Sequence, residues 1–144
     1  MDSTLPQVAD HVTAVSACIV AENLDRTADW YRDALGLELL SRLDIPDRGE
    51  RVAFIGRGNV LVELSERRGS AGLRRADPPE HSHVQGPSHL SLRVDALDPV
   101  LAELTLRGVP TAVGPVDIAP LALRVAFVRD NEGNLIEFVQ DARS

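Results

Sequence analysis

The chain contains no lysine, because all 15 of its basic residues are arginine. This absence excludes catalysis through a lysine Schiff base and a phosphate-binding loop that ends in Gly-Lys. Aromatic residues make up 3% of the chain, which is too few for a platform that stacks single-stranded nucleic acid. The net charge of −7 also argues against a nucleic-acid partner, since such partners bind basic surfaces.

Cys18 is the one cysteine, so the chain has neither an internal disulfide nor a cysteine-rich zinc site. No apolar run is long enough to cross a bilayer, and the acidic first residues do not resemble a secretory signal. We therefore expect a cytoplasmic protein with no membrane partner. A chain of 144 residues can form one domain with a core of its own.

One stretch of the sequence occurs twice. The segment 51–66 reads RVAFIGRGNVLVELSE, and the segment 124–140 reads RVAFVRDNEGNLIEFVQ. Phe54 and Phe127 are 73 positions apart, and Glu63 and Glu137 are 74 positions apart. Solenoid repeats have periods of roughly 20–50 residues, so this spacing predicts one duplicated supersecondary unit instead.

Each half of the chain predicts the element order βαβββ. The first half has a strand at 12–20, a helix at 24–35 that ends at Gly36, a strand at 37–43 and a hairpin at 51–66. The second half has a strand at 89–94, a helix capped by Asp98 that ends at Gly108, a short strand at 109–113 and a hairpin at 124–140. We expect one domain over 1–144, with module one at about 11–66, a linker at 67–86 and module two at about 87–140.

These modules predict an α+β fold in which two half-open sheets lie side by side. The helices would cover one face, and the other face would form a cup-shaped, partly closed mixed sheet. An isolated glutamate inside an apolar strand is costly to bury, so Glu63 and Glu137 should be paired, protonated or bound to a metal.

The repeat offset pairs Ser16 with His89 and Glu63 with Glu137. If the two halves form one cup, these four positions converge from different strands. One imidazole and two carboxylates suit a divalent metal ion. The alternative is that these side chains are ordinary edge or surface groups at strand ends.

Three segments, LDRTADWYRDALGLEL, SHLSLRVDAL and GNLIEFV, resemble the vicinal oxygen chelate superfamily. This superfamily includes glyoxalase I, methylmalonyl-CoA epimerase, extradiol dioxygenases, fosfomycin-resistance enzymes and bleomycin-binding proteins, and the similarity covers about residues 12–140. The resemblance implies a homodimer and one divalent ion (Ni, Co, Mn or Zn) held by Glu63, His89 and Glu137. Ser16 stands at the fourth ligand position, where glyoxalases and epimerases usually have His or Gln, and a serine hydroxyl is a poor ligand.

The sequence IPDRGERVAFI followed by GNVLVELSE resembles the epimerase branch, in which an acidic residue just before a Gly is a proton-transfer base. The matching residue is Asp47, although Pro-Asp-x-Gly is also a common turn. Resemblance to the glyoxalase branch instead implies that Glu137 itself moves the proton. The resemblance thus implies a metal-dependent isomerase, epimerase or lyase that moves a proton α to a carbonyl. Its substrate would be a small acyl compound, such as a CoA thioester, or a hemithioacetal.

Further side chains are candidates for substrate binding. Ser91 and Arg93 share the strand face of His89, and Cys18 shares that of Ser16. Arg93 would bind a substrate carboxylate or pair with an inward glutamate. The linker arginines would grip phosphates of a CoA-like tail or be solvated, and they are Arg67, Arg68, Arg74 and Arg75. The linker histidines His81 and His83 are expected to be exposed.

Two metal-free functions use the same cup. One is a protein that binds and sequesters a small molecule such as an antibiotic, and the other is a tailoring enzyme of secondary metabolism. The weak ligand Ser16 favours a metal-free protein, whereas the low aromatic content disfavours a grip on planar drugs. Fosfomycin-type and extradiol enzymes need two His and one carboxylate, the reverse of this set.

Overall fold

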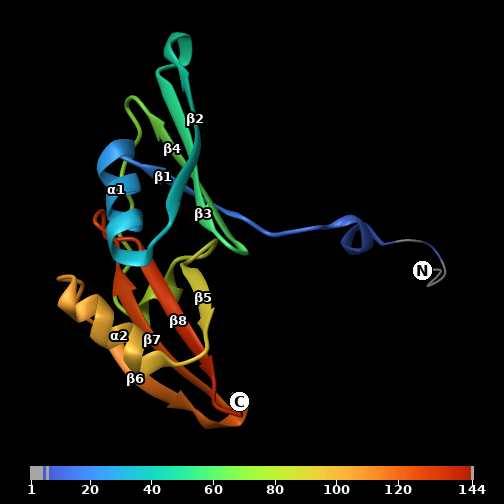
Figure 1. Cartoon of the computed structure of the whole chain (residues 1–144), viewed down its shortest axis with the longest axis vertical. Coiled ribbons are helices and arrows are strands. Elements are labelled where there is room, and N and C mark those ends of the chain that lie inside the picture. The colour runs from blue at the N-terminus through green and yellow to red at the C-terminus, as the bar shows by residue number, and fades with distance from the viewer. Residues whose placement is uncertain (1–4, 6, 144) are drawn as a thin grey trace.

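The computed structural model describes residue 5 and residues 7–143 of the chain. It has an α+β fold with two βαβββ modules (Figure 1). Module one consists of β1 (Ala17–Ala21), α1 (Leu24–Leu35), β2 (Glu38–Ile45), β3 (Glu50–Arg57) and β4 (Val60–Arg67). Module two consists of β5 (Leu90–Val94), α2 (Leu97–Leu106), β6 (Val113–Ile118), β7 (Leu123–Arg129) and β8 (Leu135–Asp141). No helix among the described residues is both long and apolar enough to span a membrane.

Each module forms a four-stranded mixed sheet, and the two sheets are separate. The strand orders are β1-β4-β3-β2 and β5-β8-β7-β6, and β1 and β5 run parallel to β4 and β8. Glu63 lies between Cys18 and Phe54 in the first sheet. Glu137 lies between Ser91 and Phe127 in the same way in the second. The duplication seen in the sequence therefore extends to the pairing register.

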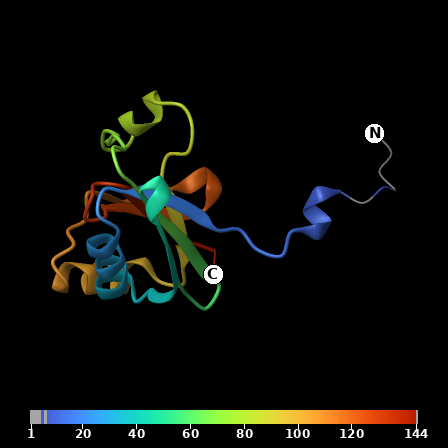
Figure 2. The same ribbon diagram turned by 90° about the horizontal axis from the view of Figure 1, so that it is seen from above.

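One hydrophobic core links the two modules. Both helices lie on the same side of the molecule, against their sheets (Figures 1 and 2). Their buried side chains join those of the inner strands in a single cluster, whose members include Leu24, Tyr31, Ile55, Leu64, Leu97, Leu101, Leu104, Val128 and Ile136. Burial of a side chain of this size contributes about 1.5–3 kcal/mol, so the core fixes how the helices lie against the sheets.

The two helices begin in different ways. The side chain of Asn23 accepts a hydrogen bond from the Arg26 amide, and α1 ends at Gly36 in the left-handed conformation, as predicted. The prediction that Asp98 caps the second helix is wrong, because α2 already begins at Leu97. The amide of Leu97 instead donates a 2.7 Å hydrogen bond to Gln140 Oε1 on β8, so a distant strand supplies the acceptor.

Two predicted strands are displaced. The first strand begins at Ala17 rather than at residue 12, because its pairing with β4 starts at Ala17 and Val62. Residues 7–14 run away from both sheets (Figures 1 and 2). The strand predicted at 109–113 is found at 113–118. Val109 instead donates to the Leu104 carbonyl at 2.8 Å and is buried, so it completes the end of α2.

Candidate functional site

Three of the predicted site residues meet in module two. His89 directly precedes β5, which pairs with β8 so that Ser91 lies opposite Glu137. His89 Nε2 is 3.5 Å from Glu137 Oε1, and both side chains are partly buried. The Ser91 hydroxyl donates a 2.9 Å hydrogen bond to the same carboxylate oxygen. Parallel pairing of these two strands thus brings the three polar side chains together.

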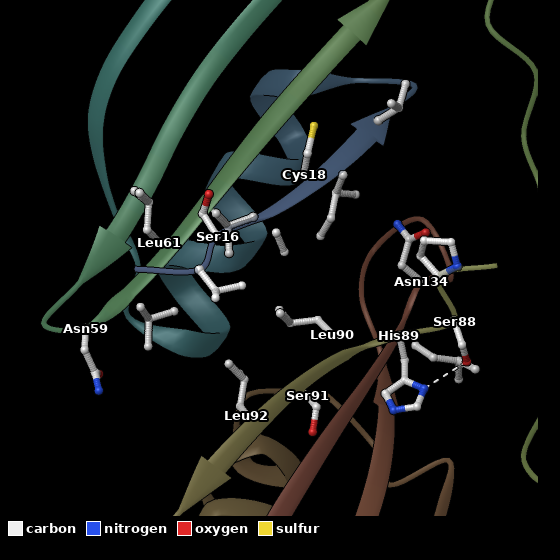
Figure 3. Close-up of a pocket in the computed structure, with 18 residues that line it drawn as sticks. Ser16, Cys18, Asn59, Leu61, Ser88, His89, Leu90, Ser91, Leu92 and Asn134 are labelled. Atoms are coloured by element: carbon white, nitrogen blue, oxygen red, sulfur yellow. Dashed lines mark hydrogen bonds between the residues drawn. The ribbon is translucent and has the colours of Figure 1, made fainter. Parts of the chain in front are cut away.

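The His89 ring is held by further contacts. Ser88 Oγ lies 2.9 Å from His89 Nδ1 (Figure 3). The ring also packs edge-to-face on Phe127 of β7, with 5.2 Å between centroids and an angle of 82° between planes. Because Phe127 lies opposite Glu137 in the sheet, one row of β7 and β8 supplies both the packing surface and the carboxylate.

Module one has the corresponding row without the imidazole. Glu63 on β4 lies opposite Cys18 on β1, and Phe54 occupies the place of Phe127. Partial burial, and secondarily the charge of Glu63, raise the pKa of the Cys18 thiol. A raised pKa keeps this sulfur protonated at neutral pH, so Cys18 is poorly suited to act as a nucleophile.

A hollow of about 750 Å³ lies between the edge strands β1 and β5. Ser16 and Cys18 line it from module one, and His89 and Ser91 from module two (Figure 3). Among the residues that the structure describes, neither Glu63 nor Glu137 lines this hollow. The structure therefore brings four of the predicted residues around one space but does not bring the two glutamates together in it.

The donor chemistry of His89 and Glu137 fits a divalent metal ion. The imidazole nitrogen and the carboxylate oxygen lie 3.5 Å apart and would be able to hold one divalent ion together. A single chain does not complete such a site, since no three His, Cys, Asp or Glu side chains in its described part are arranged to hold a metal. Glu63 therefore cannot join this pair within one chain in the observed arrangement.

Two other predicted residues lie elsewhere. Asp47 is exposed in a 3-10 turn, Pro46–Arg48, which joins β2 to β3 at the end of module one far from β5 (Figure 1). Arg93 is exposed on β5 and borders a second hollow of about 560 Å³ next to α2. Hydrogen bonds from Arg143, and more weakly the charge of Arg93, lower the pKa of Asp141 to about 2. The charge of Arg93 thus favours the ionised form of Asp141 at the end of β8.

Sequence reasoning missed the role of the linker. Arg75 was expected to be solvated or to grip phosphates, but its guanidinium is bonded to carbonyl oxygens of its own loop. The expectation that His81 is exposed is wrong, since its side chain is half-buried and its Nδ1 atom is buried. His83 is exposed as expected. A His-x-His pattern close before His89 was the available signal, but the path of the loop could not be read from it.

A model of the Glyoxalase/Bleomycin resistance protein/Dioxygenase superfamily matches residues 8–138. The chain belongs to this superfamily. The match confirms the resemblance found in the sequence, and the four candidate ligand positions all fall within the matched residues.

Curated relatives of this superfamily member include enzymes of two kinds. A lactoylglutathione lyase from Neisseria meningitidis serogroup A is 27% identical over 124 residues, covering 82% of this chain and 83% of the relative. The mitochondrial methylmalonyl-CoA epimerase from Mus musculus is 25% identical over 129 residues, covering 85% and 69%. The relatives thus include both a lyase and an epimerase.

Solved structures share the fold. Glyoxalase I from Zea mays superposes with a TM-score of 0.70 at 25% identity, covering 90% of this chain and 44% of that one. A glyoxalase family protein from Enterococcus faecalis superposes with a TM-score of 0.68 at 22% identity, covering 89% and 95%. The second superposition covers most of both chains, so the shared fold extends over most of this chain.

Proposed function

We propose that this protein is a metal-dependent isomerase, epimerase or lyase that moves a proton α to a carbonyl. The observation that carries the proposal is the 3.5 Å separation of His89 Nε2 and Glu137 Oε1, which suits two ligands of one divalent ion. Relatives named as a lactoylglutathione lyase and a methylmalonyl-CoA epimerase support this reaction class. The substrate would be a small acyl compound, such as a CoA thioester, or a hemithioacetal.

A homodimer would complete the site. One chain supplies His89 and Glu137, and module one of a second copy supplies Glu63 with Ser16 beside it. This arrangement is supported by the matched register, in which Glu63 and Glu137 occupy equivalent places in two sheets. It also gives Glu63 a partner, since a single chain does not place it with the other two donors. Ni, Co, Mn or Zn would suit this donor set.

The carboxylate of Glu137 would carry the proton. It takes the proton from the carbon next to the carbonyl, and the electron pair of the broken C–H bond moves toward the carbonyl oxygen. When bound, the divalent ion supplies a Lewis acid that stabilises the negative charge on that oxygen. Delivery of a proton to the opposite face of the same carbon inverts it, and return of the proton from Glu137 to the neighbouring carbon isomerises the substrate. The Ser91 hydroxyl holds Glu137 Oε1 at 2.9 Å and so orients the carboxylate.

Asp47 is the proposed second base. It belongs to module one, like Glu63, so it would reach the substrate from the second copy rather than from the chain that supplies His89. Two carboxylates on opposite sides of one carbon can act as base and acid in an epimerisation. Asp47→Asn should then abolish inversion while deuterium exchange at the α carbon, catalysed by Glu137, persists.

The first test is metal content. Protein purified without a polyhistidine tag is dialysed and measured by elemental analysis, alongside Glu63→Ala, His89→Ala and Glu137→Ala. Near one divalent ion per chain, lost in all three variants, is the expected result. His83→Ala is the matched control, because His83 is exposed and should keep the ion. Absence of metal after reconstitution with Ni, Co, Mn or Zn would reject the proposal.

A second test asks whether two copies share each site. Glu63→Ala and His89→Ala chains are expressed together and the mixed dimer is purified. If each site combines module one of one copy with module two of the other, the mixed dimer has one intact site and binds half the metal. A site built within one chain would leave both sites damaged, so a mixed dimer without metal would contradict the shared arrangement.

A metal-free binding protein is the second candidate, and Ser16 is the observation that favours it. Ser16 lines the 750 Å³ hollow, and at the fourth ligand position that the family resemblance implies, its hydroxyl is a weak metal ligand. Ser16→His should therefore raise metal affinity if the site is a metal site. If neither wild type nor this variant binds metal, small molecules that raise the melting temperature of the wild type would support the binding function.

A further inference from the structure

The linker between the modules is an ordered loop built around Arg75. The Arg75 guanidinium donates to the carbonyl oxygens of four residues, at 3.0, 2.6, 3.4 and 2.7 Å for His81, Val84, Gln85 and Pro87 respectively. A planar guanidinium has five donors in fixed directions, so one side chain can hold several turns of backbone in one shape. Arg75 therefore determines the path of the loop that leads into β5.

A second arginine attaches this loop to module two. Arg129, at the end of β7, donates to the Arg75 carbonyl at 2.8 Å and to the Asp77 carboxylate at 2.7 Å. It also donates to the Gly133 carbonyl at 2.7 Å. The loop is thus bound at one end to β7 through Arg129 and continues at the other end into β5.

This attachment places His81 against the candidate site. Its ring lies 5.7 Å from the His89 ring, measured between centroids, with 49° between the planes. It also lies 5.7 Å from the Phe127 ring at 60°. His89 is therefore bordered by Phe127 from the sheet and by His81 from the linker, while its nitrogens face Ser88 and Glu137.

We propose that His81 is a positioning residue of this site, which holds the His89 ring in the orientation that directs Nε2 toward Glu137. The inference rests on the role of His89 in the proposed function. Loss of the hydrogen-bonded partners that fix the ring of a ligating histidine typically weakens metal binding by about 10- to 100-fold, and we expect loss of the ring contact with His81 to act in the same direction. The linker, through Arg75 and Arg129, is then part of the site rather than a passive connection.

The Nδ1 atom of His81 distinguishes this role from others. It is buried and has no hydrogen-bond partner among the described residues. A buried polar atom without a partner is destabilising, whereas an apolar ring of similar shape carries no such cost. If the ring alone orients His89, His81→Phe should keep the orientation and raise the melting temperature by about 2–4 °C.

The test compares His81→Ala, His81→Phe and the exposed neighbour His83→Ala in the full-length protein. Co²⁺ is titrated by visible absorption, and melting temperatures are measured on the same samples. We expect His81→Ala to bind Co²⁺ at least about 10-fold more weakly, and His81→Phe and His83→Ala to bind within about threefold of wild type. Wild-type affinity in His81→Ala would overturn the proposal. Weak binding in His81→Phe would also overturn it, because the nitrogen rather than the ring would then be required.

A metal-independent readout separates this inference from the proposed function. The NMR signals of the His89 ring nitrogens report its contacts with Ser88 and Glu137 in the metal-free protein. They should change in His81→Ala and be retained in His81→Phe and His83→Ala. If wild type binds no Co²⁺ but these signals change as expected, the metal proposal fails and the positioning role stands. Unchanged signals in His81→Ala would remove the positioning role itself.

Arg75→Ala extends the test to the loop. Loss of the guanidinium frees four carbonyl oxygens and should disturb the His89 signals and weaken Co²⁺ binding in the same direction as His81→Ala. Arg74→Ala is the matched control, because Arg74 is the exposed neighbour in the same loop. Equal effects of the two arginine variants would contradict a specific role for the Arg75 contacts.

Discussion

The hydroxyl of Thr27 in α1 donates a 3.0 Å hydrogen bond to the carboxylate of Glu132, which lies in the turn between β7 and β8. The same carboxylate accepts hydrogen bonds from the backbone amides of Glu22 at 2.7 Å and Asn23 at 2.9 Å. Module two therefore places a negative charge at the N-terminus of the helix of module one, where a negative charge is favourable.

Glu132→Gln should lower the free energy of unfolding by about 1–2 kcal/mol, because the amide has one acceptor oxygen and no charge. Urea denaturation at neutral pH measures the change. Glu38→Gln is the control, since Glu38 is exposed at the start of β2 and should change stability by less than about 0.5 kcal/mol. Equal effects of the two substitutions would show that the contact across the modules contributes little.

Tyr31 is buried in the core, and its hydroxyl donates a 2.8 Å hydrogen bond to Asp130. Tyr31→Phe should cost about 1–3 kcal/mol at pH 7, because the buried carboxylate of Asp130 loses a donor. Asp130 also accepts from the amides of Glu132 and Asn134, so this loss should loosen the turn that carries Glu132. Denaturant unfolding at pH 7 measures the cost, and an unchanged midpoint would contradict the expectation.

The same residue gives the protein a defined alkaline pH dependence. Burial raises the pKa of Tyr31 far above its ordinary value, and the negative charge of Asp130 and the hydrogen bond to it raise the pKa further. The unfolded chain releases the Tyr31 proton near pH 10, while the folded chain keeps it. The protonated hydroxyl therefore makes its full contribution to the free energy of unfolding below pH 10. Above that pH, stability should fall by up to about 1.4 kcal/mol per pH unit.

Two features of the sequence make this slope measurable. The chain has no lysine, and Tyr31 is its one tyrosine. The Cys18 thiol also titrates in the alkaline range with a raised pKa, so the comparison uses a Cys18→Ser background. Unfolding between pH 9 and 11 should show the decline with Tyr31 present and lose it in Tyr31→Phe. A decline of the same slope in both would assign it to other groups.

The two helices differ in the residue that accepts their first amide. Glu66 accepts from the Leu24 amide at 2.8 Å and binds Arg51 through both carboxylate oxygens, and Arg51 lowers its pKa. Gln140 holds the equivalent place in module two and lies opposite Arg124, the counterpart of Arg51. Module two thus has the arginine but no carboxylate at this position.

Gln140→Glu should therefore raise the free energy of unfolding by about 0.5–1 kcal/mol at pH 7, through a charge at the N-terminus of α2. The pKa of a carboxylate beside arginine is lowered, so this gain should be present above about pH 4.3 and disappear as the pH falls below it. The reverse change, Glu66→Gln, should destabilise module one. Thermal unfolding at pH 7 and pH 3.5 checks both, and a gain that persists at pH 3.5 would exclude the charge as its cause.

Ala122 has a left-handed backbone conformation, with φ of 52° and ψ of 44°. Its counterpart in module one, Gly49, has φ of 62° and ψ of 34° after an equivalent 3-10 turn. Because this conformation crowds Cβ, Ala122→Gly should stabilise the protein by about 0.5–1 kcal/mol, and Gly49→Ala should destabilise it. Melting temperatures of the two variants should shift in opposite directions, and shifts of the same sign would contradict the expectation.

The hairpins were well predicted from the sequence. The repeat of Arg-Val-Ala-Phe and the Gly-Asn turns marked β3–β4 and β7–β8, because tight turns and alternating side chains are local properties. The start of α2 was not well predicted, because Asp98 has the residue type of a cap while the acceptor for the Leu97 amide is Gln140, 43 positions from Leu97. The displacement of β6 has a similar cause, since the Val109 amide is hydrogen-bonded to the Leu104 carbonyl at the end of the preceding helix.

The sequence by itself determined the two βαβββ modules, the equivalence of Glu63 with Glu137 and the shared strand face of His89 and Ser91. Periodicity and a 73- to 74-residue repeat specify these features without knowledge of the rest of the fold. Tertiary structure decided that His89 meets Glu137 without Glu63, and that the linker brings His81 to His89. The physical reason is that module orientation and loop path depend on long-range hydrogen bonds, such as those of Glu132 and Arg129, whose partners no local pattern identifies.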